Sequence, residues 1–134
     1  MELKEMALVR IKIDENRNEQ VIILREKEGS RYLPMVIGMA EVNAIKLKLS
    51  GIKPPRPLTH DLLLETANRL GGTLSKVLID KLENNTFYAK IVFARNGDEV
   101  SVDARPSDSV ALALRAGSPI YCAEEVLNLA GIEE

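Results

Sequence analysis

A short polar motif occurs twice in this sequence, each time where a helix is predicted to begin. Residues 56–61 read Arg-Pro-Leu-Thr-His-Asp, and residues 105–108 read Arg-Pro-Ser-Asp. One interpretation is helix capping, with Thr59 or Ser107 as the N-cap and an acid in the first turn that complements the helix dipole. The other is an anion site, because an arginine beside a helix N-terminus can bind phosphate and a neighbouring carboxylate can hold a hard cation. The residues alone leave both interpretations open.

Four side chains, three of them in or beside these motifs, have types suited to proton transfer or metal binding. His60 shares a helix face with apolar residues and Asp61 lies on the polar face, so the two side chains are predicted to diverge. Imidazole suits proton transfer, although a partly buried, hydrogen-bonded histidine is the alternative. Glu41 borders an apolar helical stripe and is expected to form either a salt bridge or a site. Asp103, at a strand end, is expected either to line a site or to face water.

Composition and charge exclude several classes of protein. The net charge of −2 gives no global positive field, so any nucleic-acid contact must be local. No apolar stretch approaches the roughly 20 residues of a membrane helix, and no secretory signal is legible, so we expect no membrane span and a cytoplasmic location. One cysteine and one histidine are too few for a Cys/His zinc site, and Cys122 is predicted to be a buried, inert thiol. Phosphate-loop, dinucleotide-binding, serine-hydrolase and zincin motifs are absent.

The elements that must position these residues follow from hydrophobic periodicity and turn residues. Strands are predicted at 6–13, 21–24, 32–37, 75–82, 86–94, 100–103 and 120–122, and helices at 38–50, 60–70, 108–116 and 124–129. Asn84 and Asn85 predict a hairpin turn, and the helix at 108–116 is predicted to be the most buried because its interior is apolar on nearly every side. The pattern predicts one α+β domain over residues 1–134, with a mixed, largely antiparallel sheet and three to four helices packed on it. We also expect a symmetric homodimer.

Beyond these local patterns, the sequence resembles the bifunctional nuclease family over nearly its whole length. The most specific segments are Arg-Pro-Leu-Thr-His-Asp at 56–61 and Asp-Ala-Arg-Pro-Ser-Asp at 103–108, supported by Leu-Pro-Met-Val-Ile-Gly at 33–38. The resemblance implies cleavage of RNA and DNA. Its motifs fall on the polar residues that were already candidates: Glu41, His60, Asp61, Asp103, Arg105 and Asp108.

Phosphodiester hydrolysis requires an activated water, stabilisation of charge on the phosphoryl oxygens and protonation of the leaving oxygen. Under the resemblance, the catalytic groups are His60, Asp61 and Asp108, the ligands of Mg²⁺ or Mn²⁺ are Glu41, Asp61, Asp103 and Asp108, and the phosphate-binding residues are Arg56 and Arg105. The substrate is expected to be single-stranded or flexible, since no duplex-gripping surface is evident. One alternative is a non-enzymatic regulatory or protein-interaction module whose Arg/Asp/His cluster is a structural polar network. A third hypothesis is a small-anion-binding domain.

Overall fold

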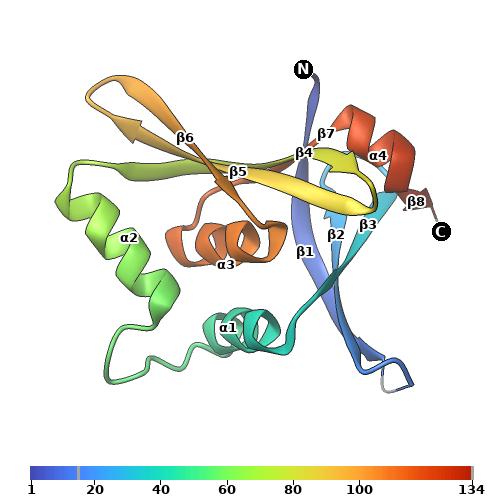
Figure 1. Cartoon of the computed structure of the whole chain (residues 1–134), viewed down its shortest axis with the longest axis horizontal. Helices are drawn as coiled ribbons and strands as arrows, with labels where there is room; N and C mark the ends of the chain where they lie inside the picture. The colour runs from blue at the N-terminus through green and yellow to red at the C-terminus, as the bar shows by residue number, and fades with distance from the viewer. Residues whose placement is uncertain (15, 134) are drawn as a thin grey trace.

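Eight strands form one sheet in the computed structural model of this chain, which describes residues 1–14 and 16–133 (Figure 1). Residues 15 and 134, in the predicted first turn and at the end of the predicted domain, lie outside the described residues. The strands are β1 (Leu3–Asp14), β2 (Glu19–Glu26), β3 (Arg31–Ile37), β4 (Thr73–Glu83), β5 (Thr86–Arg95), β6 (Asp98–Ala104), β7 (Ile120–Ala123) and β8 (Ile132–Glu133). Their order in the sheet is β6-β5-β4-β7-β1-β2-β3-β8. Only β4 and β7 pair in parallel among these described strands.

The short strand β7 joins two antiparallel halves of the sheet. It pairs in parallel with β4 on one side and antiparallel with β1 on the other. The described residues also form four helices: α1 (Met39–Ser50), α2 (Thr59–Arg69), α3 (Pro106–Ala116) and α4 (Glu124–Ala130). In Figure 1, α3 lies between α1 and the strands β4 and β5, while α2 and α4 lie at opposite ends of the molecule. The predicted α+β fold with a largely antiparallel sheet is confirmed.

Helix α3 is the central packing element, as its composition predicted. Its buried residues are Ser107, Ser109, Val110, Ala111, Leu112 and Ala113, more than in any other helix of the described chain. Small side chains allow close approach, and α3 packs against α1, α2, β4 and β5. Because α3 contacts both other helices near the polar motifs, its first turn is placed where side chains from α1 and α2 can reach it.

Turn residues account for most element boundaries. Asn84 and Asn85, with φ of 52° and 62°, form the predicted β4–β5 hairpin, since a type I′ turn needs positive φ at both central positions. Gly51, with φ of 76°, ends α1 in the left-handed conformation.

The predicted N-caps are wrong. The cap of α2 is Leu58 and the cap of α3 is Arg105, and neither cap residue uses its own side chain as a hydrogen-bond acceptor for the helix. Pro106 begins α3 because the first helical position needs no N–H. Thr59 falls inside α2, where the Leu58 N–H is satisfied instead by the Asp61 carboxylate at 3.3 Å.

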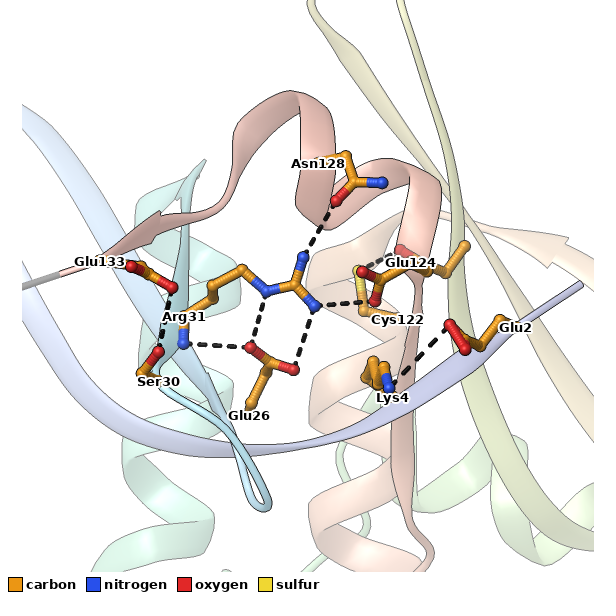
Figure 2. A network of polar contacts seen from close by, with 10 residues as sticks. Glu2, Lys4, Glu26, Ser30, Arg31, Cys122, Glu124, Asn128 and Glu133 are labelled. Atoms are coloured by element: carbon orange, nitrogen blue, oxygen red, sulfur yellow. Dashed lines mark hydrogen bonds and ion pairs between the residues drawn. The ribbon is translucent and has the colours of Figure 1, made fainter.

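A buried ionic network ties the β2–β3 hairpin to α4 (Figure 2). The Arg31 guanidinium donates from Nε to Glu26 Oε1 at 2.7 Å, from Nη2 to Glu124 Oε2 at 2.7 Å and from Nη1 to Asn128 Oδ1 at 3.1 Å. Glu26 is only 5% exposed. A Cβ on Gly29 would lie 2.7 Å from the Glu26 carboxyl carbon, so this hairpin needs glycine for close approach. The network stabilises the packing of the β2–β3 hairpin against α4, and it contains no residue of the polar motifs.

No helix in the described part of the chain is long and apolar enough to cross a membrane.

Candidate active site

The first turns of α2 and α3 meet through a histidine and an aspartate. His60 Nε2 lies 3.0 Å from Asp108 Oδ1, although 48 residues separate them in sequence. Each side chain lies near the start of its helix, and α2 packs directly against α3. The two copies of the polar motif therefore each contribute one residue to the same place in the fold.

Arg105 links this pair to the first turn of α1. Its guanidinium donates from Nε to Asp108 Oδ2 at 3.0 Å, and its Nη1 forms an ion pair with Glu41 Oε1 at 3.2 Å. Glu41 is held in α1, which begins directly after β3. We call Glu41, His60, Arg105 and Asp108 the polar cluster. Its members come from three helix starts that the packing of α3 brings together.

The contact between His60 and Asp108 determines which ring nitrogen of His60 carries the proton when the imidazole is neutral. Burial would raise the pKa of Asp108, but hydrogen bonds from Arg105 and His60 lower it below its ordinary value. The Asp108 hydrogen bond raises the pKa of Arg105 above its ordinary range. An ionised carboxylate only accepts hydrogen bonds, so His60 Nε2 must donate to Asp108. Neutral His60 then has Nδ1 as a proton acceptor.

The polar cluster is open to solvent on one side. All four side chains line a hollow of about 290 Å³, together with residues of α1 and the start of α2. The His60 side chain is 15% exposed and that of Arg105 is 67% exposed. Two of the five guanidinium N–H groups serve the contacts to Asp108 and Glu41, so others remain for an incoming anion. A phosphate placed in this hollow would meet both a guanidinium and a proton-transfer group.

The remaining predicted site residues lie elsewhere. Asp61 points away from His60, as predicted, and accepts a hydrogen bond from Arg115 Nε at 3.0 Å. Asp103 is 75% exposed and lies 3.8 Å from Lys90 Nζ on the neighbouring strand. Arg56 lines a separate hollow beside the end of α1. The structure thus unites four of the seven predicted residues and leaves Arg56, Asp61 and Asp103 outside the polar cluster.

The expected Mg²⁺ or Mn²⁺ ligands do not fit a protein-only metal site. Among the described residues no group of three or more His, Cys, Asp or Glu side chains is placed to hold an ion. Glu41 and Asp108 already share the Arg105 guanidinium, which donates a hydrogen bond to Asp108 and forms an ion pair with Glu41. A cation there would face the guanidinium charge, which opposes binding.

Sequence reasoning missed Arg115, which organises the neighbouring packing. Its side chain is only 5% exposed, and besides Asp61 it donates to the carbonyl oxygens of Ala44 at 3.1 Å and Ala111 at 3.3 Å. Arg115 therefore fastens α1, α2 and α3 together beside the polar cluster. The available signal was an arginine in the last turn of an otherwise apolar helix, a position that must find acceptors when buried.

Cys122 is buried, and burial raises its pKa to about 12, so the thiol stays protonated. The prediction that Cys122 is a buried core residue is confirmed.

Comparisons with known proteins give a consistent result. A family model described as "Bifunctional nuclease domain" matches residues 22–134. Over 128 residues the chain is 49% identical to an uncharacterized protein of Mycobacterium tuberculosis, covering 96% of this chain and 76% of that protein. It is 27% identical over 114 residues to "Bifunctional nuclease 1" of Oryza sativa subsp. indica, covering 82% of this chain and 34% of that protein. For "Bifunctional nuclease 1" of Arabidopsis thaliana the identity is 23% over 103 residues, covering 74% of this chain and 32% of that protein.

Proposed function

The chain belongs to the bifunctional nuclease domain family, and from this premise we propose that it hydrolyses phosphodiester bonds in nucleic acid. The observation that carries the proposal is the series of contacts from His60 through Asp108 to Arg105, which lines an open hollow. It combines a proton acceptor, a carboxylate that orients it and a guanidinium that can bind phosphate. These are the groups that water attack on phosphorus requires.

In the proposed reaction, His60 Nδ1 accepts a proton from a water molecule as the water oxygen bonds to phosphorus. Asp108 holds the imidazole in the productive tautomer and stabilises the imidazolium that forms. Arg105 donates hydrogen bonds to the non-bridging oxygens, where negative charge develops. The bond from phosphorus to the leaving oxygen then breaks, and that oxygen takes the proton from the imidazolium. Glu41 keeps the guanidinium in position through its contact with Nη1.

The substrate we propose is single-stranded or flexible RNA or DNA. With a net charge of −2, the chain has no global positive field to attract a duplex, so its contact with phosphate must be local. A flexible strand can bend a single phosphate into a hollow of about 290 Å³. We place the reaction in the cytoplasm, an expectation that rests on the sequence.

His60→Ala tests the function. We expect purified protein to cleave end-labelled single-stranded oligonucleotides, and we expect the variant to be slower by roughly 10² to 10⁴-fold, the usual contribution of acid–base catalysis. Gel analysis of the products measures the rates, and thermal melting by circular dichroism checks that the variant remains folded. Unchanged cleavage by folded His60→Ala would refute the assignment of the site.

The same assay, run in EDTA and then with added MgCl₂ or MnCl₂, addresses the ion requirement that the resemblance implies. Because the described residues form no ligand set, EDTA should leave the melting temperature of the free protein unchanged. Loss of cleavage in EDTA with recovery in Mg²⁺ would support a metal requirement. Undiminished cleavage in EDTA would assign the chemistry to the protein side chains.

A structural polar network without activity is the second candidate function. It is favoured by one observation, which is that all four members of the polar cluster have ionic or hydrogen-bonding partners. The openness of the hollow and the 67% exposure of Arg105 argue against it, since a purely structural network gains most from being dry.

We further propose that the chain forms a homodimer through α2. None of the residues of α2 is buried, and Leu62 and Leu63 are 56% and 39% exposed. A helix with exposed leucines is stabilised when a second copy covers it. Light scattering should give about twice the chain mass at micromolar concentration, and Leu62→Glu should shift the mass to that of a monomer. Leu129→Glu, which charges a similarly exposed leucine on α4, should leave the dimer intact. A monomer mass for the unmodified protein would contradict the proposal.

A further inference from the structure

A second hollow, beside the end of α1, is unusually basic for a chain of net charge −2. It has a volume of about 380 Å³, and the charged side chains that line it are Lys48, Lys53, Arg56, Arg115 and Asp61. The negative charge of Asp61 is compensated by Arg115, which donates a hydrogen bond to it. The other three cations are exposed and belong to no ion pair within residues 1–14 and 16–133. The hollow therefore presents a local positive charge that its own carboxylate does not cancel.

This basic hollow follows the polar cluster along the same face of α1. Glu41 and Ala44 line the hollow of the polar cluster, and Lys48 and Gly51 line the basic hollow. Positions 41, 44, 48 and 51 are spaced by three or four residues and so share one side of the helix. The first turn of α2 separates the two hollows, since His60 lines one and Asp61 lines the other.

A third hollow, of about 540 Å³, lies on the other side of the Glu41–Arg105 pair, which lines both it and the hollow of the polar cluster. Phe87 is among its lining residues and supplies an aromatic surface, the kind on which bases of single strands stack. The three hollows are thus consecutive along α1. Their chemistry runs from an aromatic ring, through the polar cluster, to a group of cations.

We propose that the basic hollow is a phosphate subsite for a single-stranded nucleic acid that runs along α1 through the polar cluster. This inference rests on the proposed function and adds how the substrate is held. Glu41 and Gly51 are ten residues apart, which is about 15 Å along a helix, or roughly four nucleotides at the 3.4 Å spacing of a stacked strand and fewer if the strand is extended. Lys48, Lys53 and Arg56 bind a phosphate some nucleotides away from the bond that is cleaved.

The test measures binding of a fluorescent ten-residue oligothymidylate by anisotropy, with His60→Ala in every protein so that the probe stays intact. Lys48→Ala/Lys53→Ala is compared with Lys12→Ala/Lys46→Ala. The control removes the same charge from exposed lysines that line none of the three hollows. Lys46 lies on α1 itself, so the control also carries a change in the same helix.

We expect Lys48→Ala/Lys53→Ala to weaken binding of the ten-residue strand about 10-fold relative to the control. The slope of log affinity against log salt should become shallower by about 0.7 for each phosphate that the variant no longer neutralises. A labelled dinucleotide is too short to reach from the polar cluster to the basic hollow, so the two double variants should bind it equally. Inorganic phosphate, compared with chloride at equal ionic strength, should not displace the ten-residue strand.

Equal binding of the ten-residue strand by the two double variants would overturn the inference. So would displacement of that strand by millimolar inorganic phosphate, because the basic hollow would then be a small-anion site. The result is separate from that of the cleavage assay. Cleavage without the length-dependent weakening of binding would refute only the subsite, and weakened binding without cleavage would refute only the nuclease activity.

Discussion

Asp108→Asn should abolish cleavage while leaving the protein folded. We expect a fall of about 10³ to 10⁴-fold in turnover, similar to the effect of removing the orienting aspartate from a catalytic triad. The asparagine amide can face His60 and donate to Nε2, which would move the ring proton to Nδ1 and remove the acceptor. Arg105 would also lose a charged partner. Rates on single-stranded oligonucleotides and unfolding in urea measure the two effects separately.

The loss of stability should be small, about 1 to 2 kcal/mol, because asparagine keeps the shape and one acceptor at a side chain that is 31% exposed. Asp103→Asn is the matched control, since Asp103 is exposed and pairs only with a surface lysine. It should keep full activity. If Asp108→Asn instead lowered the free energy of unfolding by ~2 to 4 kcal/mol, and the unmodified protein showed no cleavage, the structural polar network would be the correct interpretation.

The stability difference between the unmodified protein and Asp108→Asn should depend on pH in a definite direction. The folded-state pKa of Asp108 is lowered, so its carboxylate stabilises the fold above its ordinary pKa, and this contribution is lost as pH falls through the folded value. Asparagine has no such contribution. The difference should therefore be largest near neutral pH and should shrink in acid below about pH 3.8.

The secondary structure was largely predictable because its signals are local. Alternating apolar residues, the Asn84-Asn85 turn and Gly51 placed the strands and helices to within a few residues. The caps were not predictable from the types of the residues alone, because Pro106, which precedes the predicted cap Ser107, is itself the first residue of α3. The strand β8 was missed because two residues carry too little pattern to signal a strand.

The sequence identified the residues of the candidate site better than it identified which of them lie together. Residue types and helix positions singled out His60, Asp108, Arg105 and Glu41, and the divergence of His60 from Asp61 followed from helical spacing. Their distances depend on how α3 packs against α1 and α2, which no local pattern reveals. Partners that are distant in sequence, such as Arg115 for Asp61, were missed for the same reason.

The Arg31 network was also missed by sequence reasoning, because it includes partners that are distant in sequence. Substitution of Arg31 is the change from which we expect the largest loss of stability. Arg31→Met should lower the free energy of unfolding by about 3 to 5 kcal/mol, because it leaves the buried Glu26 carboxylate without its main partner. Methionine retains much of the apolar stem, so the destabilisation reports on charge more than on volume. Urea unfolding at pH 7 measures the change.

Arg69→Met is the matched control for this prediction. Arg69 Nε lies 2.8 Å from Glu65 Oε1, nearly the same as the 2.7 Å between Arg31 and Glu26. The exposed fractions differ sharply, at 82% and 56% for the surface pair and 19% and 7% for the buried one. Since exposed helical ion pairs contribute only about 0.3 to 0.5 kcal/mol, Arg69→Met should be almost neutral. Equal effects of the two substitutions would refute the role assigned to burial.

Acid should narrow the difference in stability between the unmodified protein and Arg31→Met. In the unmodified protein the Arg31 hydrogen bond lowers the pKa of Glu26, so the carboxylate stabilises the fold above about pH 4.5 and loses this contribution as pH falls further. In Arg31→Met, burial alone should raise the folded-state pKa of Glu26, so protonation relieves an unpaired charge and stability rises as pH falls. Arg31→Met/Glu26→Gln removes that charge at every pH and should recover part of the stability at pH 7. The stability of this double variant should also vary less with pH than that of the unmodified protein or of Arg31→Met, because the Glu26 carboxylate, which titrates at the centre of the network, is no longer present.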